Sequence, residues 1–243
     1  MCKSIDNCVH LLYMLIYTVD VHRGGSPMIK LDNIRKLIGN FMLRNITLEI
    51  PEGYIIGLIG ANGCGKTSLL HVLMGLYRPD SGEMELMGMR YPINVAELHD
   101  QIGVVLQERL YEDYMTLQEN AAYYGRFYSK YDEVYLLELL KKYELDPKRK
   151  YKGLSKGEEL KFQFAVALAH HPKLLILDEP TGNFDPEFRD EFLKSLKDFI
   201  SDGEHTVILA THLTDDLDKI ADYIIYMEEG GILTAMDIEE LRS

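Results

Sequence analysis

Cysteine is scarce in this chain, and its three cysteines form no recognisable pattern. Cys2, Cys8 and Cys64 have neither the short spacing of metal ligands nor the arrangement of a disulfide framework. The sequence therefore argues against a disulfide-stabilised domain and against a cysteine-based metal site. This cysteine usage is consistent with a reducing cytosol.

Basic residues are also in deficit. The chain has 26 Lys and Arg against 39 Asp and Glu, which gives a formal net charge of -13. Such a charge repels polyanions, so direct binding to nucleic acid is disfavoured. A local basic patch remains the alternative.

Long hydrophobic runs are missing as well. The longest apolar stretch, residues 9–21, is interrupted by His10, Thr18 and Asp20. It is too short and too polar to cross a bilayer, which takes about 20 residues. It also lacks the charged head and the small-residue exit of a secretory signal.

The amino-terminal segment does not resemble the rest of the chain. Met28 begins the first expected strand, and residues 23–25 (R-G-G) are what a translated purine-rich ribosome-binding site would encode. We therefore expect residues 1–27 to be a non-native or disordered extension and the domain to cover residues 28–243. The alternative is a segment that docks on a membrane surface or on a partner.

A glycine-rich segment at residues 60–68 reads G-A-N-G-C-G-K-T-S and fills the pattern G-x-x-x-x-G-K-[ST]. Glycines let successive backbone N–H groups point at phosphate oxygens, and a following helix directs its positive end at the same anion. Lys66 supplies a positive charge for the β and γ phosphates, and the Thr67 hydroxyl is suited to ligate Mg²⁺. The residues expected to bind the nucleotide are Gly60, Asn62, Gly63, Cys64, Gly65, Lys66, Thr67 and Ser68.

The flanking sequence separates this loop from an ordinary glycine-rich turn. The apolar run at residues 54–59 precedes it, and Leu69, Leu70, Val72 and Leu73 follow it with helical spacing. The order is therefore strand, loop and helix, as a phosphate-binding loop requires. Cys64 lies inside the loop, where it is either a small filler or an exposed thiol open to alkylation.

A second candidate element is the run L-L-I-L-D-E at residues 174–179. Its apolar part is typical of a strand buried on both faces of a parallel sheet, and ligands bind at the carboxyl ends of such strands. Asp178 would hold the Mg²⁺ shell, and Glu179 would polarise the attacking water. A D-E pair after an apolar strand is common by itself, so the upstream loop carries much of this interpretation.

The remaining pattern is that of an alternating α/β domain. With 243 residues, 47% of them hydrophobic, the chain can build one large core and a smaller helical one. We expect core strands at residues 103–106, 174–177, 206–210 and 223–227, and edge strands of a small β portion at residues 29–33, 46–50 and 82–86. Between residues 112 and 169 the periodicity is helical, with one helix opened by Thr116 and another marked by Val134, Leu137, Leu140 and Lys141.

Five motifs in a fixed order resemble the ATP-binding subunits of ABC transporters, over nearly all of residues 28–243. They are the phosphate loop, G-V-V-L-Q ending at Gln107, L-S-K-G-E at residues 154–158, L-L-I-L-D-E-P-T-G-N-F-D at residues 174–185, and L-A-T-H ending at His212. The resemblance implies an α/β P-loop NTPase with a mostly parallel core sheet, a small antiparallel β subdomain and a helical subdomain inserted at about residues 112–169.

The resemblance also implies roles for individual residues. Gln107 would sense Mg²⁺ and mark the groove for a membrane partner, and His212 would contact the γ phosphate. The implied catalytic residues are Glu179, His212 and Lys66, the implied metal ligands are Thr67, Gln107 and Asp178, and the residues that would reach the nucleotide of a partner subunit are Ser155, Gly157 and Asp185.

Each of these residues also has a plainer interpretation. Gln107 would otherwise be a surface glutamine, and His212 a structural histidine behind a buried strand. Asp185, which precedes a proline, could cap the next helix. Ser155 could cap a helix with Glu158 as its capping-box partner, and the two roles of Ser155 are compatible.

The chain departs from the family pattern at two places. The usual signature is L-S-G-G-Q, whereas Lys156 and Glu158 stand here at its third and fifth positions. Lys156 would add positive charge near the second nucleotide, and Glu158 could pair with Lys156 or repel the γ phosphate. The segment that usually carries an aromatic ring under adenine is aliphatic at residues 36–39, with Phe41 nearby as a substitute, so we expect weak selectivity among purine triphosphates.

The implied activity is hydrolysis of ATP to ADP and phosphate, with ATP and Mg²⁺ as cofactors. It would power transport through a separate integral membrane permease, and the L-S-K-G variant and the compact length favour an exporter. No internal repeat is present, so the chain holds one ATPase module. The resemblance implies that each ATP needs residues from two modules, so two copies, or this chain and a paralogue, would pair as a homodimer or heterodimer. The subunit would be cytoplasmic, peripheral on the inner face of the cell membrane. The alternatives are an ABC-superfamily ATPase without a transport role and a nucleotide sensor, although Asp178 and Glu179 argue against the latter.

Overall fold

The computed structural model describes residues 27–212 and 214–238. The extension expected at residues 1–27 lies outside the described residues, with the exception of Pro27. This proline is the first residue of strand β1 (Pro27–Ile38) and is paired with Pro51, so the first strand starts one residue earlier than expected.

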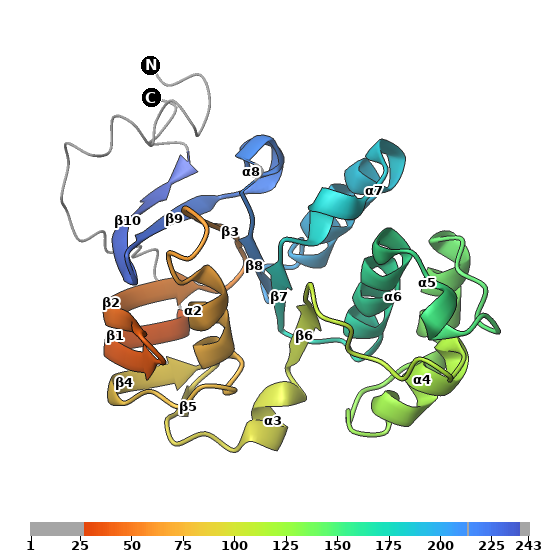
Figure 1. Ribbon diagram of the computed structural model, residues 1–243, viewed down its shortest axis with the longest axis horizontal. Helices are drawn as coiled ribbons and strands as arrows, with labels where there is room; N and C mark the ends of the chain where they lie inside the picture. Colours follow the sequence, from red (N-terminus) through yellow and green to blue (C-terminus); the bar gives the residue numbers. More distant parts are fainter. Residues whose placement is uncertain (1–26, 213, 239–243) are drawn as a thin grey trace.

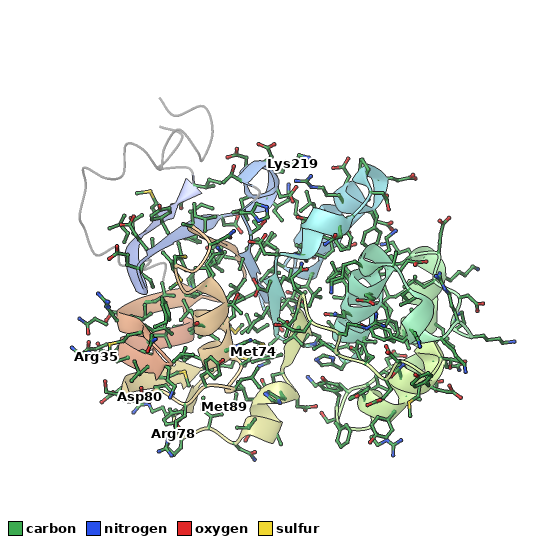
Figure 2. All side chains as sticks on the ribbon, viewed as in Figure 1. Arg35, Met74, Arg78, Asp80, Met89 and Lys219 are labelled. Carbon is green, nitrogen blue, oxygen red and sulfur yellow. The ribbon has the colours of Figure 1, made fainter. Side chains whose placement is uncertain are left out.

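A four-stranded antiparallel sheet forms the small β part of the molecule, drawn at the lower left of Figure 1. Its strand order is β2-β1-β4-β5, with β2 at Phe41–Pro51, β4 at Ser81–Leu86 and β5 at Met89–Arg90. The expectation that residues 29–33 and 82–86 form edge strands is therefore wrong. β1 is paired on both sides, and β4 is covered by the two-residue strand β5, which is too short to detect in the sequence.

The second sheet has six strands in the order β10-β9-β3-β8-β7-β6. All its neighbouring pairs are parallel except β9 with β10, which agrees with the expected mostly parallel core sheet. The strands are β3 (Ile55–Ile59), β6 (Ile102–Val105), β7 (Leu174–Asp178), β8 (Thr206–Ala210), β9 (Tyr223–Glu228) and β10 (Gly231–Asp237).

Both faces of the six-stranded sheet are covered, so β3, β7 and β8 are buried along their whole length. Because side chains alternate along a strand, one strand contributes to two cores. Leu175 and Leu177 of β7 join a cluster with the helices of the carboxy-terminal half, whereas Leu174 and Ile176 join a cluster with α2 (Lys66–Leu73) and the small sheet. This two-sided burial explains the continuous apolar runs in these strands.

The helical part occupies the opposite side of the molecule from the four-stranded sheet, at the right of Figure 1. It comprises α4 (Leu117–Gly125), α5 (Glu133–Lys142), the short η1 (Tyr151–Gly153) and α6 (Lys156–Ala169). Thr116 opens α4 with a capping box, as expected. The other helical elements are α3 (Val95–His99), η2 (Pro180–Asn183), α7 (Pro186–Phe199) and α8 (Thr214–Ile220).

Helix α5 forms where the periodicity predicts it, but one of the apolar residues that marked it faces solvent. Leu136, Leu139 and Leu140 are buried, whereas Val134 is 70% exposed. Apolar residues lie on most sides of this helix, so their spacing alone leaves its rotation undetermined. Among the helices of residues 27–212 and 214–238, none combines the length and the apolar character needed to cross a membrane.

Candidate nucleotide-binding and hydrolysis site

The glycine-rich loop connects β3 to α2, so it lies at the carboxyl end of a central parallel strand. Gly65 is the N-cap of α2 and has a φ of 112°, a conformation that side chains with a Cβ rarely adopt. A Cβ at Gly65 would also lie 2.7 Å from the Phe41 ring. Glycine therefore allows the loop to turn tightly and to direct the first N–H groups of α2 into the space above it.

Lys66 begins α2 and is only 7% exposed. Its ammonium group donates a hydrogen bond of 2.8 Å to the carbonyl oxygen of Gly60, across the mouth of the loop. A buried ammonium group needs acceptors, and phosphate oxygens are stronger acceptors than one carbonyl. The loop thus holds a positive charge at the place where the sequence predicts the phosphates.

Cys64 is a packing residue of the loop. It is 6% exposed and belongs to the core cluster between the two sheets, next to Gly60, where an added Cβ would lie 2.6 Å from the Cys64 sulfur. This burial favours the small-filler interpretation over an exposed thiol, because alkylation requires access to the sulfur.

A hydrogen bond links Thr67, at the start of α2, to Asp178, at the end of β7. The Thr67 hydroxyl donates a hydrogen bond of 2.7 Å to Asp178 Oδ2. Burial raises the pKa of the Asp178 carboxyl, and the bond from Thr67 opposes this rise only in part. A cation at this point would hold the carboxylate ionised, and oxygen donors of this kind suit Mg²⁺.

Glu179 follows β7 in a left-handed backbone conformation, with φ 50° and ψ 45°. For a residue other than glycine this conformation costs roughly 1–2 kcal/mol. The Glu179 carboxylate accepts hydrogen bonds from the backbone N–H of His212 at 3.2 Å and from its Nδ1 at 2.7 Å. Strain at a cavity edge together with two donors to one oxygen is typical of a functional carboxylate.

Gln107 lies just beyond β6 and crosses to the same end of the sheet. Its side-chain Nε2 donates to the carbonyl oxygen of Glu179. Gln107 is exposed, as the plainer interpretation of a surface glutamine expects, but its side chain also contacts the segment that carries Glu179. The parallel pairing of β6 with β7 is what brings these two residues together.

One cavity of about 490 Å³ unites most of the predicted residues. This volume is within the usual range for small-molecule sites, about 300–1,000 Å³. The walls are formed by Ile38, Phe41, Asn62, Gly63, Gly65, Lys66, Thr67, Ser68, Gln107, Glu108, Asp178 and Glu179. Gly60, Cys64 and His212 are predicted site residues that are not among them. Ser155, Gly157 and Asp185, the three residues predicted to reach a partner's nucleotide, are also absent.

Ser155 and Gly157 lie at the start of α6, where Ser155 and Glu158 form a complete capping box. The structural role predicted for Ser155 is thus confirmed. At Gly157, a Cβ would lie 2.6 Å from the carbonyl oxygen of Asn183, so a larger residue would push the two segments apart. The signature turn and the loop before Asp185 therefore meet in close contact.

The two unusual signature residues do not pair with each other. The Glu158 carboxylate contacts the Arg149 guanidinium, and Lys156 Nζ donates to the carbonyl oxygen of Gln107 instead. Burial opposes ionisation of Glu158, yet its bonds from Ser155 and Arg149 lower the pKa overall. The suggestion that Glu158 pairs with Lys156 is wrong because α6 turns the two side chains in different directions.

Asp185 caps α7, as the proline after it suggested. Its Oδ1 accepts from the Phe188 N–H at 2.8 Å, and its Oδ2 lies 3.2 Å from Lys161 of α6. The bond from Phe188 and the contact with Lys161 lower the Asp185 pKa. The carboxylate thus fixes the start of α7 against α6.

Asp216, which the motif analysis missed, links the segments that carry Glu179, Asp185 and His212. This carboxylate of α8 is 0% exposed and accepts from Thr181 Oγ1 and from Arg189 Nε, both at 2.7 Å. Thr181 lies in η2, just after Glu179, and Arg189 lies in α7, one turn after Asp185. An aspartate in the first turn of a short helix resembles an ordinary helix start, so the sequence contained no specific signal.

The residues of the cavity wall next to the phosphate loop bear on the predicted weak selectivity between purine bases. Ile38 and Phe41 line it, so one aliphatic side chain and one ring border the loop. We predict dissociation constants for ATP and GTP within about tenfold of each other, because stacking on the Phe41 ring, worth roughly 1–3 kcal/mol, favours either purine base alike. Competition against a fluorescent triphosphate measures both constants. A strong preference for ATP would contradict this prediction, and Phe41→Ala should weaken both nucleotides alike.

A mostly parallel sheet with a phosphate loop, a carboxylate pair and a glutamine at one cavity defines a P-loop nucleoside triphosphatase. A model described as ABC transporter matches residues 43–182, more than half of the chain. The ABC transporter ATP-binding protein YtrB of Bacillus subtilis is 30% identical over 216 residues, which cover 88% of this chain and 74% of that protein. The Nod factor export ATP-binding protein I of Cupriavidus metallidurans is 31% identical, with 84% and 69% covered.

Among solved structures, a dimeric ATP-binding cassette in a post-hydrolysis state, bound to ADP and Pi, is similar. Its TM-score is 0.78 at 27% identity, and the match covers 87% of this chain and 99% of that one. The chain therefore belongs to the ABC transporter family. It is an ATP-binding subunit that hydrolyses ATP to drive transport.

Proposed function

We propose that this chain powers an exporter by closing, with a second ATPase subunit, over two Mg²⁺-bound ATP molecules. The observation that carries the proposal is the division of the predicted site. The phosphate loop, Gln107, Asp178 and Glu179 share one cavity, whereas Ser155 and Gly157 lie outside it. A second subunit would supply the missing wall, either as an identical copy or as a paralogue.

The ATPase domain would comprise residues 28–243, with residues 112–169 as its helical subdomain. Lys66 and the N–H groups of the loop would hold the β and γ phosphates. Thr67, Asp178 and Gln107 would hold Mg²⁺, which supplies charge stabilisation at the phosphates when it is bound. The adjacent hydroxyl and carboxylate oxygens of Thr67 and Asp178 support this assignment, since Mg²⁺ in such sites takes a few protein oxygens and substrate phosphates.

Hydrolysis would proceed by in-line attack of water on the γ phosphorus. Glu179 would orient and polarise this water, and His212, whose Nδ1 already contacts the Glu179 carboxylate, would lie next to the γ phosphate. The developing charge would be stabilised by Lys66 and by the loop N–H groups. Ser155, Gly157 and Asp185 would complete the site of the partner subunit.

The transport partner would be a separate integral membrane permease, with this subunit cytoplasmic and peripheral on the inner face of the membrane. The export direction is supported by the likeness to the Nod factor export protein, which is 31% identical. The acidic net charge of -13 does not favour a nucleic-acid partner. The transported substrate would be recognised by the permease.

Co-purification tests the transport role directly. We expect a polytopic membrane protein to co-isolate with this chain from detergent-solubilised membranes, in stoichiometric amount and with retained ATPase activity. A matched isolation from the soluble fraction is the control for non-specific recovery. Recovery of the active ATPase from both fractions without any membrane protein would favour the alternative, an ABC-superfamily ATPase without a transport role.

A further inference from the structure

Lys156 connects two parts of the proposed site that are far apart in the sequence. Its side chain extends from the first turn of α6 to the segment after β6, where Nζ donates to the main-chain carbonyl of Gln107. The side chain is 31% exposed, so the ammonium group is partly withdrawn from solvent. Glycine, the usual residue at this position of the signature, has no side chain to make such a connection.

A second contact braces the same two segments. Glu159, also in the first turn of α6, has a carboxylate that is only 4% exposed. One of its oxygens lies 2.6 Å from Arg109 Nη1 and the other 3.5 Å from Lys156 Nζ. A buried carboxylate requires such partners, because removing one would leave a charge without compensation. Lys156 and Arg109 thus hold residues 107–109 against the start of α6.

The other side of this brace faces the phosphate-loop cavity. The Gln107 side chain lines the cavity and donates to the carbonyl of Glu179, while its own carbonyl accepts from Lys156. Ser155 and Gly157 directly flank Lys156. A chain of direct contacts therefore runs from the cavity through Gln107 and Lys156 to the turn that would meet the partner's nucleotide.

We propose that Lys156 is a positioning residue that couples occupancy of the chain's own phosphate loop to the placement of Ser155 and Gly157. Any movement of Gln107 on nucleotide binding displaces the carbonyl to which Lys156 is attached, and the first turn of α6 follows. Lys156 acts within its own subunit, rather than on the partner's phosphates. This inference rests on the proposed composite site, since only there does the signature turn contact a nucleotide.

Amide hydrogen exchange of the full chain tests the coupling at concentrations where light scattering reports a monomer. The chain carries no other substitution, and the probe is a non-hydrolysable ATP analogue with Mg²⁺ at saturation, because Glu179→Gln with ATP is expected to form a dimer. We expect the analogue to slow exchange in peptides that contain residues 155–159. Lys156→Ala should reduce this change, although the Arg109–Glu159 contact remains, while the dissociation constant for ATP stays the same. Lys156→Arg should restore the change because it keeps a positive charge and hydrogen-bond donors at the same position.

Lys152→Ala is the matched control, because Lys152 lies in η1, just before the signature turn, and places its ammonium 5.1 Å from the Tyr114 ring centroid. It should keep the exchange change of the parent. With ATP as the substrate, Lys156→Ala should lower turnover by roughly 2- to 30-fold, as expected for coupling networks. Thermal unfolding of each variant confirms that the comparison concerns folded protein.

Three results would overturn the proposal. These are an analogue-induced change that is undiminished in Lys156→Ala, the absence of any change in the parent monomer, and a failure of Lys156→Arg to restore it. An intact exchange response in Lys156→Ala combined with lost turnover would assign Lys156 to the partner's nucleotide instead. The composite site is tested separately by Ser155→Ala, since unchanged turnover in that variant would refute shared pockets whatever Lys156 does.

Discussion

Replacement of Glu179 by glutamine is expected to lower ATP turnover by roughly 10²- to 10⁴-fold, the usual contribution of a general base. The amide keeps the size of the side chain but loses the charge that polarises water. ATP affinity should remain close to that of the parent, because Lys66 and the phosphate loop are untouched. Steady-state phosphate release measures turnover, and equilibrium titration measures binding.

The same substitution should trap a dimer. In the proposed function ATP joins two subunits and hydrolysis separates them, so a subunit that binds without turning over would stay assembled. Size-exclusion chromatography with ATP and Mg²⁺ should show Glu179→Gln at twice the parent mass. Glu204→Gln is the matched control, because Glu204 is exposed in the turn before β8 and outside the cavity. A Glu179→Gln variant with parental turnover would remove this residue from the mechanism.

Replacement of Lys66 by alanine is expected to abolish ATP binding. The buried ammonium group, which is 7% exposed and held on Gly60, provides the positive charge that faces the phosphates in the proposed site. A charge-assisted contact with phosphate is about twice as strong as a neutral hydrogen bond, and Lys66 would make more than one. Titration with ATP and Mg²⁺ should show no saturation over a range in which the parent is fully bound.

The control for Lys66 is Lys30→Ala. Lys30 is a lysine of β1 with a side chain 55% exposed and paired with Glu49, so its loss removes the same charge far from the loop. Its nucleotide affinity should equal that of the parent. Thermal unfolding without nucleotide distinguishes lost binding from lost folding. Normal ATP affinity in folded Lys66→Ala would contradict the role proposed for this lysine.

The local parts of the site were the most predictable from the sequence. The phosphate loop and the strand that ends at Asp178 are continuous segments, and their residue types determine their backbone geometry and burial without contacts from distant parts of the sequence. Their cavity could also be anticipated, because parallel strands bring their carboxyl ends to one edge of a sheet. Gln107 also follows a strand of this sheet, but its role was implied by the resemblance to ABC transporter subunits, because the residues alone are equally consistent with a surface glutamine.

Features that depend on packing between distant segments were not predictable in the same way. The pairing of β1 on both sides could not be read from the sequence, because its second neighbour, β4, lies some fifty residues further along the chain. The contacts of Lys156 with Gln107 and of Glu158 with Arg149 depend on side-chain directions, which spacing does not fix. Asp216 gave no signal because its importance comes from its two buried partners.

At Glu179, low backbone strain and the presence of a carboxylate favour different residues. Glycine, and to a lesser degree asparagine, occupies left-handed φ values with less strain than glutamate, so either substitution would relieve part of the local strain. If variants were selected for thermal stability alone, we would expect glycine or asparagine at position 179, and the carboxylate would be lost. The glutamate at this position therefore costs local backbone strain while it supplies the carboxylate that the proposed hydrolysis requires.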